Sequence, residues 1–200
     1  MPALTLVAVL VGYLIGAFPS GVVVGRLAGA DPRDSGSGRT GTTNALRSLG
    51  LRWAAAVAVL DLAKGAVAVL AGNAIGPEPW AGALAAVAAV IGHVWSVFIG
   101  FRGGRGVATG GGAMLILAPL AALAAAAELV AVVAATRLVS LGSISASITM
   151  VLVTVVLFAV GWVGLEALVA AALIALVVVV AHVDNIGRLL SGTERRLGER

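Results

Sequence analysis

Cysteine is absent from this sequence of 200 residues, and charged side chains make up only 11% of it. Without cysteine, the chain can form neither a disulfide nor a thiolate nucleophile nor a thiolate metal ligand. Charged residues account for roughly a quarter of a typical soluble domain, so this chain has too few of them to cover a surface that faces water. A soluble globular fold is therefore excluded, and the apolar runs decide the class.

Several catalytic motifs are also missing. Five residues after His93 and His182 stand Phe98 and Gly187, so no HxxxxD motif occurs. Neither a GxSxG nucleophile elbow nor an HExxH metal site is present. With two histidines and no cysteine in the chain, we expect no metal site and no cofactor.

Apolar residues make up 60% of the chain and fall into long runs. A helix that crosses a bilayer needs about 20 mostly apolar residues. The runs predict an all-α, polytopic integral membrane protein, a single membrane domain over residues 1–200, with seven transmembrane helices at about 4–24, 53–75, 80–99, 107–117, 120–135, 144–160 and 165–181. Pro119 separates the short fourth and fifth helices, because proline lacks the N–H that a helix interior needs. One long bent helix is the alternative there.

The arginines favour seven spans and set the orientation. All twelve lie in the predicted loops 26–52, 100–106 and 137–143 or in the tail 182–200, whereas the opposite connections carry none. Seven spans bring these segments to one face, which the positive-inside rule makes cytoplasmic. The N-terminus is then outside and the C-terminus cytoplasmic. Because topology accounts for the basic residues, we expect no nucleic-acid partner.

The first of these loops reads DPRDSGSGRTGTTNALRSLG over residues 31–50. Its glycines match the dinucleotide-binding GxGxxG pattern by letter, but that motif requires a preceding strand, and an apolar helix precedes this one. Glycines still let backbone N–H groups converge on an anion, and Arg39 and Arg47 add positive charge. Residues 42–44 are expected to cap a short helix that runs to Gly50. The loop is therefore a candidate phosphate site, with a flexible polar loop as the alternative.

The second loop, FRGGRG over residues 101–106, is a tight glycine turn that contains two arginines. At the start of the fourth helix it suits a second phosphate, although a turn with topogenic arginines is the alternative. In the last segment, His182, Asn185 and Arg188 are spaced by three residues and so share one helical face. A cluster of this kind at a helix end is hard to explain by solvation alone.

Other polar residues fall near or inside the apolar runs. His93 ends the third run and is interpreted as a packing or hydrogen-bonding residue. Asp61 and Lys64 lie near the middle of the second run, where charges are costly, and their spacing of three lets them pair. We interpret them as a structural ion pair, with a proton path as the alternative. Glu128 has no local partner in the sequence.

The order of these motifs resembles a known family. The blocks SGSGRTGTTNALRSLG, LDLAKG, GHVWSVF, FRGGRGVATG, SLGSI and HVDNIGRLLSGTE are similar, in this order, to those of the bacterial acyl-phosphate:glycerol-3-phosphate acyltransferases, the PlsY family. The resemblance covers nearly the whole chain. It implies a seven-helix enzyme of the bacterial plasma membrane that carries out the first acylation of phospholipid biosynthesis. The enzyme would transfer an acyl chain from acyl phosphate to the 1-position of glycerol 3-phosphate, at the cytoplasmic face, and yield lysophosphatidate.

The resemblance also implies roles for individual residues. Catalytic roles fall on Ser37, His182 and Asn185, and substrate or phosphate binding falls on Gly38, Thr42, Asn44, Arg47, Gly103, Gly104, Arg105, Gly106, Ser143, Arg188 and Glu194. The family usually has lysine where Arg105 stands and asparagine where Arg39 stands. Arginine keeps the charge but offers a planar fork in place of a point charge, so the rate or the substrate preference is open to change.

The chemistry agrees with the two basic loops, because both substrates are phosphate anions. Acyl phosphate is already activated, so the protein needs to align the substrates and stabilise developing charge. The base is either His182 or the phosphate of the donor. Membrane lipids are the expected surroundings, and a monomer is compatible with the sequence. Two alternatives remain: a small transporter or scramblase, marked by Asp61, Lys64 and Glu128, and an inactive lipid-binding relative.

Overall fold

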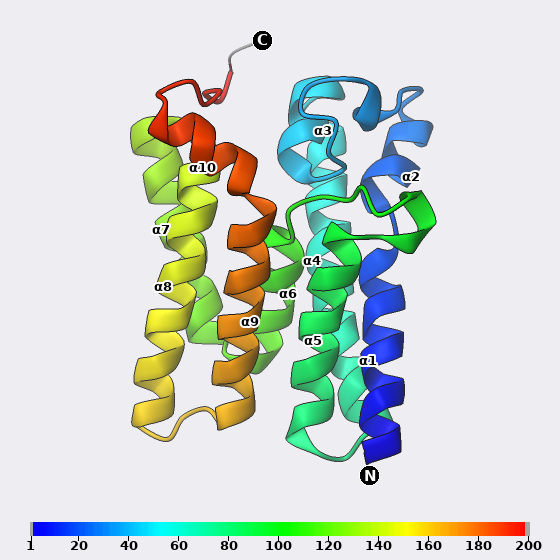
Figure 1. Cartoon of the computed structure of the whole chain (residues 1–200), viewed down its shortest axis with the longest axis vertical. Helices are drawn as coiled ribbons and strands as arrows, with labels where there is room; N and C mark the ends of the chain where they lie inside the picture. The colour runs from blue at the N-terminus through cyan, green and yellow to red at the C-terminus, as the bar shows by residue number, and fades with distance from the viewer. Residues whose placement is uncertain (1, 199–200) are drawn as a thin grey trace.

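The computed structural model describes residues 2–198, and every regular element in that range is a helix. The long helices lie side by side along the longest axis, with the N-terminus at one end and the C-terminal tail at the other (Figure 1). In chain order the helices are α1 (Pro2–Ala17), α2 (Ser20–Leu27), α3 (Thr42–Ser48), α4 (Leu51–Ile75), α5 (Pro79–Val94), α6 (Val107–Leu117), α7 (Pro119–Thr136), α8 (Val139–Ala159), α9 (Leu165–Ala181) and α10 (Val183–Leu190). Two short 3-10 helices cover Pro32–Asp34 and Val97–Ile99.

Several predicted helices lie close to their expected positions. The helices predicted over 107–117 and 165–181 are α6 and α9, with the same bounds. The pair predicted on either side of Pro119 is also found, because α6 ends at Leu117 and α7 begins at Pro119. The helix predicted over 4–24 is divided at Phe18 and Pro19 into α1 and α2. Pro19 causes this division, since it cannot donate a backbone hydrogen bond inside a helix.

Two predicted boundaries are wrong. The helix predicted over 80–99 ends at Val94, and the chain then turns through the 3-10 helix. The loop predicted over 137–143 consists only of residues 137–138, because α8 begins at Val139. Ser143 is therefore a helical residue whose hydroxyl donates to the carbonyl of Val139 at 2.9 Å. The tail predicted from residue 182 contains α10, which bends by 62° from α9.

By length and composition, fewer than seven of the described helices could each cross a membrane on their own. Within the described residues, five helical stretches are long and apolar enough to span a bilayer, or six if the bent pair of α9 and α10 counts as one. α6 has 11 residues, so at about 1.5 Å per residue it is roughly 16 Å long, which is shorter than a hydrocarbon core of about 30 Å. The chain is thus a multi-pass membrane fold, and the count of seven spans stays a prediction.

Glycines bring pairs of helices into backbone contact. A Cβ added at Gly12 or Gly16 of α1 would lie 2.5 or 1.9 Å from the carbonyl oxygen of Ala85 or Ala89 on α5. Such close approach through small residues is typical of helix pairs in membranes, where dispersion contacts replace the hydrophobic driving force. α1 and α5 are therefore held at a fixed depth relative to each other.

The other helices enclose an apolar core. Val90 of α5, Met114 of α6, Met150 of α8 and Ile174 of α9 belong to one buried cluster. α7 contributes mainly alanines to it, with Leu129 packed against them, whereas Leu120, Leu123 and Val130 are exposed. This half of the bundle is therefore built around small side chains, which leaves room between the helices.

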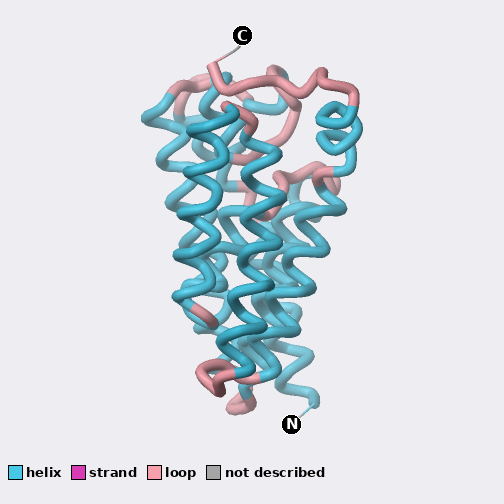
Figure 2. Tube along the Cα trace, turned by 90° about the vertical axis from the view of Figure 1, so that its left-hand side faces the viewer, coloured by secondary structure: helices cyan, strands magenta, loops and turns pink. Residues whose placement is uncertain are grey.

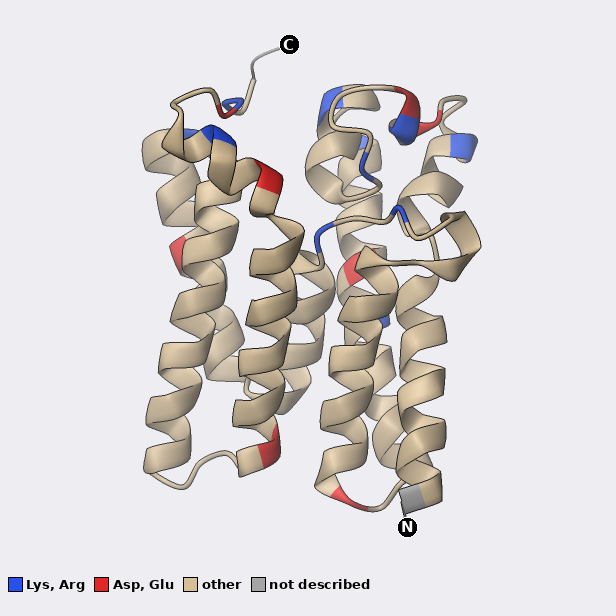
Figure 3. Cartoon of the chain, in the orientation of Figure 1, with Lys and Arg blue, Asp and Glu red and all other residues tan. Residues whose placement is uncertain are grey.

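The two ends of the bundle differ in structure and charge. α2, α3 and α10 and the long loops lie at one end, and short turns close the other end (Figures 1 and 2). Lys and Arg positions gather at the end with the long loops, while the charged positions among the described residues at the opposite end are acidic (Figure 3). The polar segments singled out in the sequence therefore meet at one end of the molecule.

Candidate functional site

The first glycine loop is organised by a single buried side chain, Asn44. Its Oδ1 accepts a hydrogen bond from the backbone N–H of Ser37 at 2.8 Å. Its Nδ2 donates to the carbonyls of Pro32, Ser35 and Arg39 at 2.5, 3.2 and 2.8 Å. The amide thus replaces the pairing that a regular element would provide, and it holds residues 32–39 in one loop.

The helix that follows this loop differs from the expected capping pattern. Gly41 is the N-cap of α3, and residues 42–44 are its first helical residues, so none of their side chains caps it. The helix ends at Ser48, two residues before the predicted end. Arg47 lies near its end and donates to the carbonyl of Arg195 in the C-terminal tail at 3.4 Å.

The second glycine loop is hydrogen-bonded to the end of α5. Gly103 N–H donates to the carbonyl of Val94 at 3.0 Å, and Gly104 N–H donates to the carbonyl of His93 at 3.2 Å. A Cβ at Gly103 would lie 1.9 Å from the His93 oxygen, and one at Gly104 would lie 2.2 Å from His93 Nε2. Both positions therefore require glycine, and the following Arg105 is directed to the interior.

A buried polar network lies beneath this second loop. Asp61 Oδ1 lies 2.9 Å from Lys64 Nζ and 3.5 Å from His93 Nδ1, and it accepts a hydrogen bond from Ser20 Oγ. Lys64 also donates to the carbonyl of Phe18 at 3.1 Å, at the break between α1 and α2. The predicted pairing of Asp61 with Lys64 is confirmed, and the pair ties three helices together.

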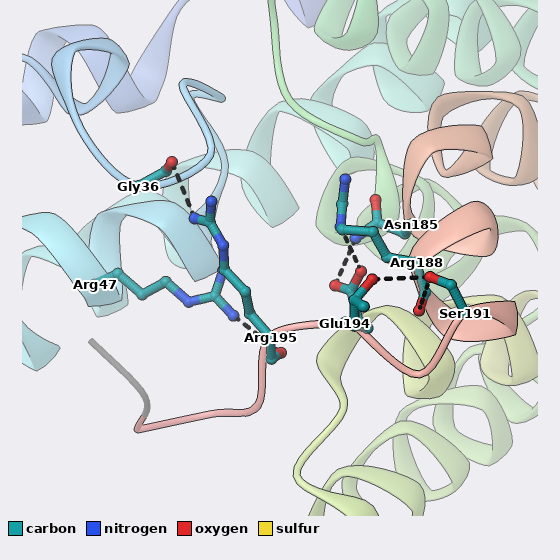
Figure 4. Close-up of polar contacts among 8 residues, drawn as sticks. Gly36, Arg47, Asn185, Arg188, Ser191, Glu194 and Arg195 are labelled. Atoms are coloured by element: carbon teal, nitrogen blue, oxygen red, sulfur yellow. Dashed lines mark hydrogen bonds and ion pairs between the residues drawn. The ribbon is translucent and has the colours of Figure 1, made fainter.

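The third polar segment lies at the junction of α9 and α10. His182 Nδ1 lies 2.7 Å from the carbonyl of Val178, and since a carbonyl only accepts, Nδ1 carries the proton and Nε2 is the basic nitrogen. Asn185 Nδ2 donates to Glu194 Oε1 at 2.7 Å, and Arg188 Nε donates to Glu194 Oε2 at 2.8 Å (Figure 4). Glu194 therefore joins the tail to α10.

These three segments line one cavity of about 490 Å³. Its polar end is formed by ten of the predicted site residues: Ser37, Thr42, Asn44, Arg47, Gly104, Arg105, Gly106, His182, Asn185 and Glu194. Ser143 lines it farther along α8. The rest of the wall is apolar and comes from α6, α7, α8 and α9, including Ala122, Ala125, Leu129, Met150 and Ile174. Asn44, Arg105 and Asn185, which are far apart in the sequence, thus face one space.

A smaller polar cavity of about 180 Å³ adjoins the first. The two share Ser37, Arg39, Arg47, Arg105, Asn185, Glu194 and Arg195. Arg188 lines only the smaller cavity. Gly38 and Gly103 line neither: Gly38 adopts a left-handed conformation at φ +66° that shapes the loop, and Gly103 packs on α5. Those two glycines are part of the scaffold around the site.

The charge around the cavities is strongly positive. The smaller cavity is lined by Arg39, Arg47, Arg105, Arg188 and Arg195 but only two acidic residues, Asp184 and Glu194. Burial lowers the pKa of the Arg105 guanidinium to about 10, and the neighbouring charge of Arg39 acts in the same direction. A bound anion would relieve both effects, so the site is suited to phosphate.

Several buried polar atoms at the cavity wall lack a hydrogen-bond partner among the described residues. Thr42 Oγ1, Arg105 Nε and Asn185 Oδ1 form no hydrogen bond with the residues that the structure describes. Buried polar atoms are normally paired, so these three are candidates for contact with a ligand. Within residues 2–198, no group of three or more His, Asp or Glu side chains is arranged to hold a metal ion.

Some residues of the cavity were not predicted. Asp61 and His93 reach its wall from below, and Arg195 reaches it from the tail. For Asp61 and His93, the distance in sequence from the motif loops is too long for a local pattern to reveal that they line the cavity. A signal was available only for Arg195, since it directly follows Glu194.

Comparison with known proteins identifies a family whose model covers nearly the whole chain. A family model described as glycerol-3-phosphate acyltransferase matches residues 6–192. Curated proteins named glycerol-3-phosphate acyltransferase from Rubrobacter xylanophilus and Thermus thermophilus are 48% and 49% identical over 116 and 110 residues. These stretches cover 58% and 55% of the chain and of the relatives alike. The alignments thus span somewhat more than half the length of the curated relatives.

Two solved structures share the fold. They are crystal structures of PlsY, an integral membrane glycerol 3-phosphate acyltransferase, in its glycerol 3-phosphate form and its lysophosphatidic acid form. Both are 36% identical to this chain, cover 97% of it, and superpose with TM-scores of 0.88 and 0.87. The match covers 96% and 95% of the two solved chains.

Proposed function

Because this chain belongs to the glycerol-3-phosphate acyltransferase family, we propose that it transfers an acyl chain from acyl phosphate to the 1-hydroxyl of glycerol 3-phosphate. The product is lysophosphatidate, and inorganic phosphate leaves. One observation carries this proposal: a single cavity joins an arginine-lined polar end to a long apolar wall. A reaction between a water-soluble phosphate ester and a lipid phosphate needs both kinds of surface at one point.

The apolar part of the cavity fits an acyl chain. Along α8 the lining runs from Val139 to Met150, a descent of about 16 Å at about 1.5 Å per residue. One leaflet of a bilayer has a hydrocarbon thickness of about 15 Å, half of the whole core. We therefore place the acyl chain between α6, α7, α8 and α9, with its phosphate at the arginines.

The smaller polar cavity fits glycerol 3-phosphate. It shares residues with the larger cavity at Ser37, Arg105 and Asn185, so substrates in the two spaces meet there. The hydroxyl oxygen forms a bond to the acyl carbonyl carbon, and the bond from that carbon to the phosphate oxygen breaks. Either His182 Nε2 or the departing phosphate takes the hydroxyl proton. The Nε–H of Arg105, which forms no hydrogen bond with the described residues, stabilises the developing negative charge.

We also propose that the site faces the cytoplasm of a bacterial cell from the plasma membrane. The gathering of basic residues at the end with the long loops supports this orientation, because positive charge favours the cytoplasmic side (Figure 3). With the N-terminus at the opposite end, the chain would cross the membrane an odd number of times. That is consistent with the predicted seven spans, if α6 and α7 together cross twice.

A direct assay tests the proposed reaction. Purified protein in lipid vesicles is given acyl phosphate and labelled glycerol 3-phosphate, without coenzyme A or acyl carrier protein. We expect labelled lysophosphatidate to form, and we expect Arg47→Ala to abolish its formation. Arg26→Ala is the matched control, because Arg26 is an exposed arginine of α2 that lines neither cavity. Absence of product from the unaltered protein would refute the proposal, as would equal activity of the two variants.

A further inference from the structure

The C-terminal tail lines both cavities with a segment that we call the strap and define as residues 193–197. At its start, Glu194 accepts hydrogen bonds from Asn185 and Arg188 of α10 at 2.7 and 2.8 Å. At its end, Leu197 N–H donates to the Arg137 carbonyl at 2.7 Å, and Arg137 NH2 donates to the Leu197 carbonyl at 2.6 Å. The strap is therefore fixed on both sides of Arg195.

Arg195 points away from α10 and toward the first glycine loop. Its NH1 donates to the carbonyl of Gly36 at 3.0 Å, and its own carbonyl accepts from Arg47 NH2 at 3.4 Å (Figure 4). Adjacent residues of an extended chain direct their side chains to opposite sides. Glu194 thus contacts α10 on one side of the cavity, and Arg195 contacts the first glycine loop on the other side.

The guanidinium of Arg195 keeps capacity for another ligand. A guanidinium has five N–H groups in a fixed fork, and the contact with Gly36 uses one of them. A phosphate forms shorter and stronger bonds with arginine than a neutral carbonyl does, often two at once. An anion in the smaller cavity would therefore be bound by Arg195 without any movement of the strap.

The contacts of the Arg195 guanidinium favour one of the two substrate phosphates. Arg195 lines both cavities, but Gly36, the partner of its guanidinium, lines the smaller polar cavity and not the larger one with the apolar wall. The smaller cavity has five arginines and two acidic residues, a formal excess of three positive charges. A small phosphate monoester with no apolar tail matches that space, whereas the acyl donor must extend along α8.

We propose that Arg195 is a phosphate-binding residue for glycerol 3-phosphate, delivered to the site by the strap. This assignment rests on the proposed function and adds a substrate contact that the loop motifs do not include. Because the strap is already held by Glu194 and Leu197, the guanidinium is in place before the substrate arrives. Preorganisation of this kind lowers the entropic cost of binding.

The proposal is tested with Arg195→Ala and Arg195→Lys, and with Arg102→Ala as control. Arg102 is an exposed arginine at the same end of the molecule that lines neither cavity. For Arg195→Ala we expect the KM for glycerol 3-phosphate to rise about tenfold or more, the loss typical of a charged hydrogen bond. The kcat and the KM for acyl phosphate should stay within about twofold, since uniform binding energy is lost. Arg195→Lys should recover part of the affinity.

Two results would overturn this assignment. One is an unchanged KM for glycerol 3-phosphate in Arg195→Ala. The other is a parallel rise of both KM values with a lower melting temperature, because that pattern belongs to a merely structural strap. Calorimetric titration with glycerol 3-phosphate alone separates this inference from the reaction. If the unaltered protein binds the compound but makes no product, the proposed function fails, and weaker binding by Arg195→Ala still supports the contact. Equal binding by both proteins refutes it.

Discussion

His93 lies between Asp61 and the second glycine loop, with Nδ1 3.5 Å from the carboxylate of Asp61. The opposite ring nitrogen, Nε2, faces Gly104 so closely that a Cβ there would lie 2.2 Å away. The ring and the backbone carbonyl of the same residue therefore both support the turn that carries Arg105. A carboxylate that fixes one histidine nitrogen also fixes the orientation of the whole ring.

His93→Ala is expected to lower activity by loosening this turn. The variant removes a buried partner of Asp61, so we expect a loss of stability of about 1–3 kcal/mol. The kcat should fall by about tenfold or more, because Arg105 loses its fixed position. His93→Gln, which keeps a polar group of similar reach, should recover part of both losses. Steady-state kinetics and thermal unfolding in detergent measure the two effects, and full activity of His93→Ala would contradict this role.

Asn44→Asp is expected to unfold the first glycine loop. The side-chain amide donates to three backbone carbonyls, and a carboxylate cannot donate to any of them. Each buried group left unpaired costs about 1–3 kcal/mol. Turnover should therefore fall by about a hundredfold, together with binding of glycerol 3-phosphate.

Ser35→Ala is the control for this loop, because the Ser35 side chain is exposed and its carbonyl, which Asn44 uses, is retained. It should keep activity close to that of the unaltered protein. The same radiolabelled product assay serves both variants. Normal turnover by Asn44→Asp would mean that the loop is held by other contacts.

Ala125→Leu is expected to shorten the acyl chains that the enzyme accepts. Ala125 is buried on α7 and lines the apolar wall, so a leucine there fills part of the cavity. Long-chain acyl phosphates should react about tenfold more slowly, while short-chain donors keep their rate. Ala127→Leu makes the same change at an exposed position of α7 and should leave the profile unaltered. Rates across a series of chain lengths provide the measurement, and identical profiles would place the acyl chain elsewhere.

Glu194 is expected to make stability depend on acidic pH. Partial burial raises its pKa, but hydrogen bonds from Asn185 and Arg188 and the charge of Arg188 outweigh burial and hold the pKa below its ordinary value of 4.5. A lowered pKa in the folded state contributes stability above pH 4.5, and that contribution is lost as the pH falls through the folded-state value.

Melting temperatures of the unaltered protein and Glu194→Gln, recorded from about pH 6 to about pH 3, test this dependence. The melting temperature of the unaltered protein should fall more steeply with acid than that of the glutamine variant. Parallel curves would mean that the carboxylate of Glu194 forms no significant ionic contact with α10.

The sequence predicted the parts of this molecule that depend on local composition. Apolar runs located α6 and α9 with their observed bounds, and Pro119 marked the turn between α6 and α7. The motif loops identified most of the polar end of the cavity. Each of these features follows from residues that are close together in the chain.

The remaining features depend on contacts between distant segments. Pro19 was visible in the first run, but an apolar run on both sides concealed the division into α1 and α2. The contact of Asn44 with substrate stays a prediction, whereas its role in holding the first glycine loop could not be predicted from the sequence. The position of Arg195 depends on where Arg137 and Gly36 lie in space, which no spacing in the sequence encodes.

The glycines of α1 have an effect well beyond their own helix. Gly16 meets Ala89 without room for a methyl group, and Ala89 lies one turn before His93, whose carbonyl holds Gly104. The packing of α1 against α5 consequently sets the position of the second loop along the bundle axis. A single added carbon near the middle of the bundle would lift or tilt α5, and the arginine that faces the phosphates would move with it.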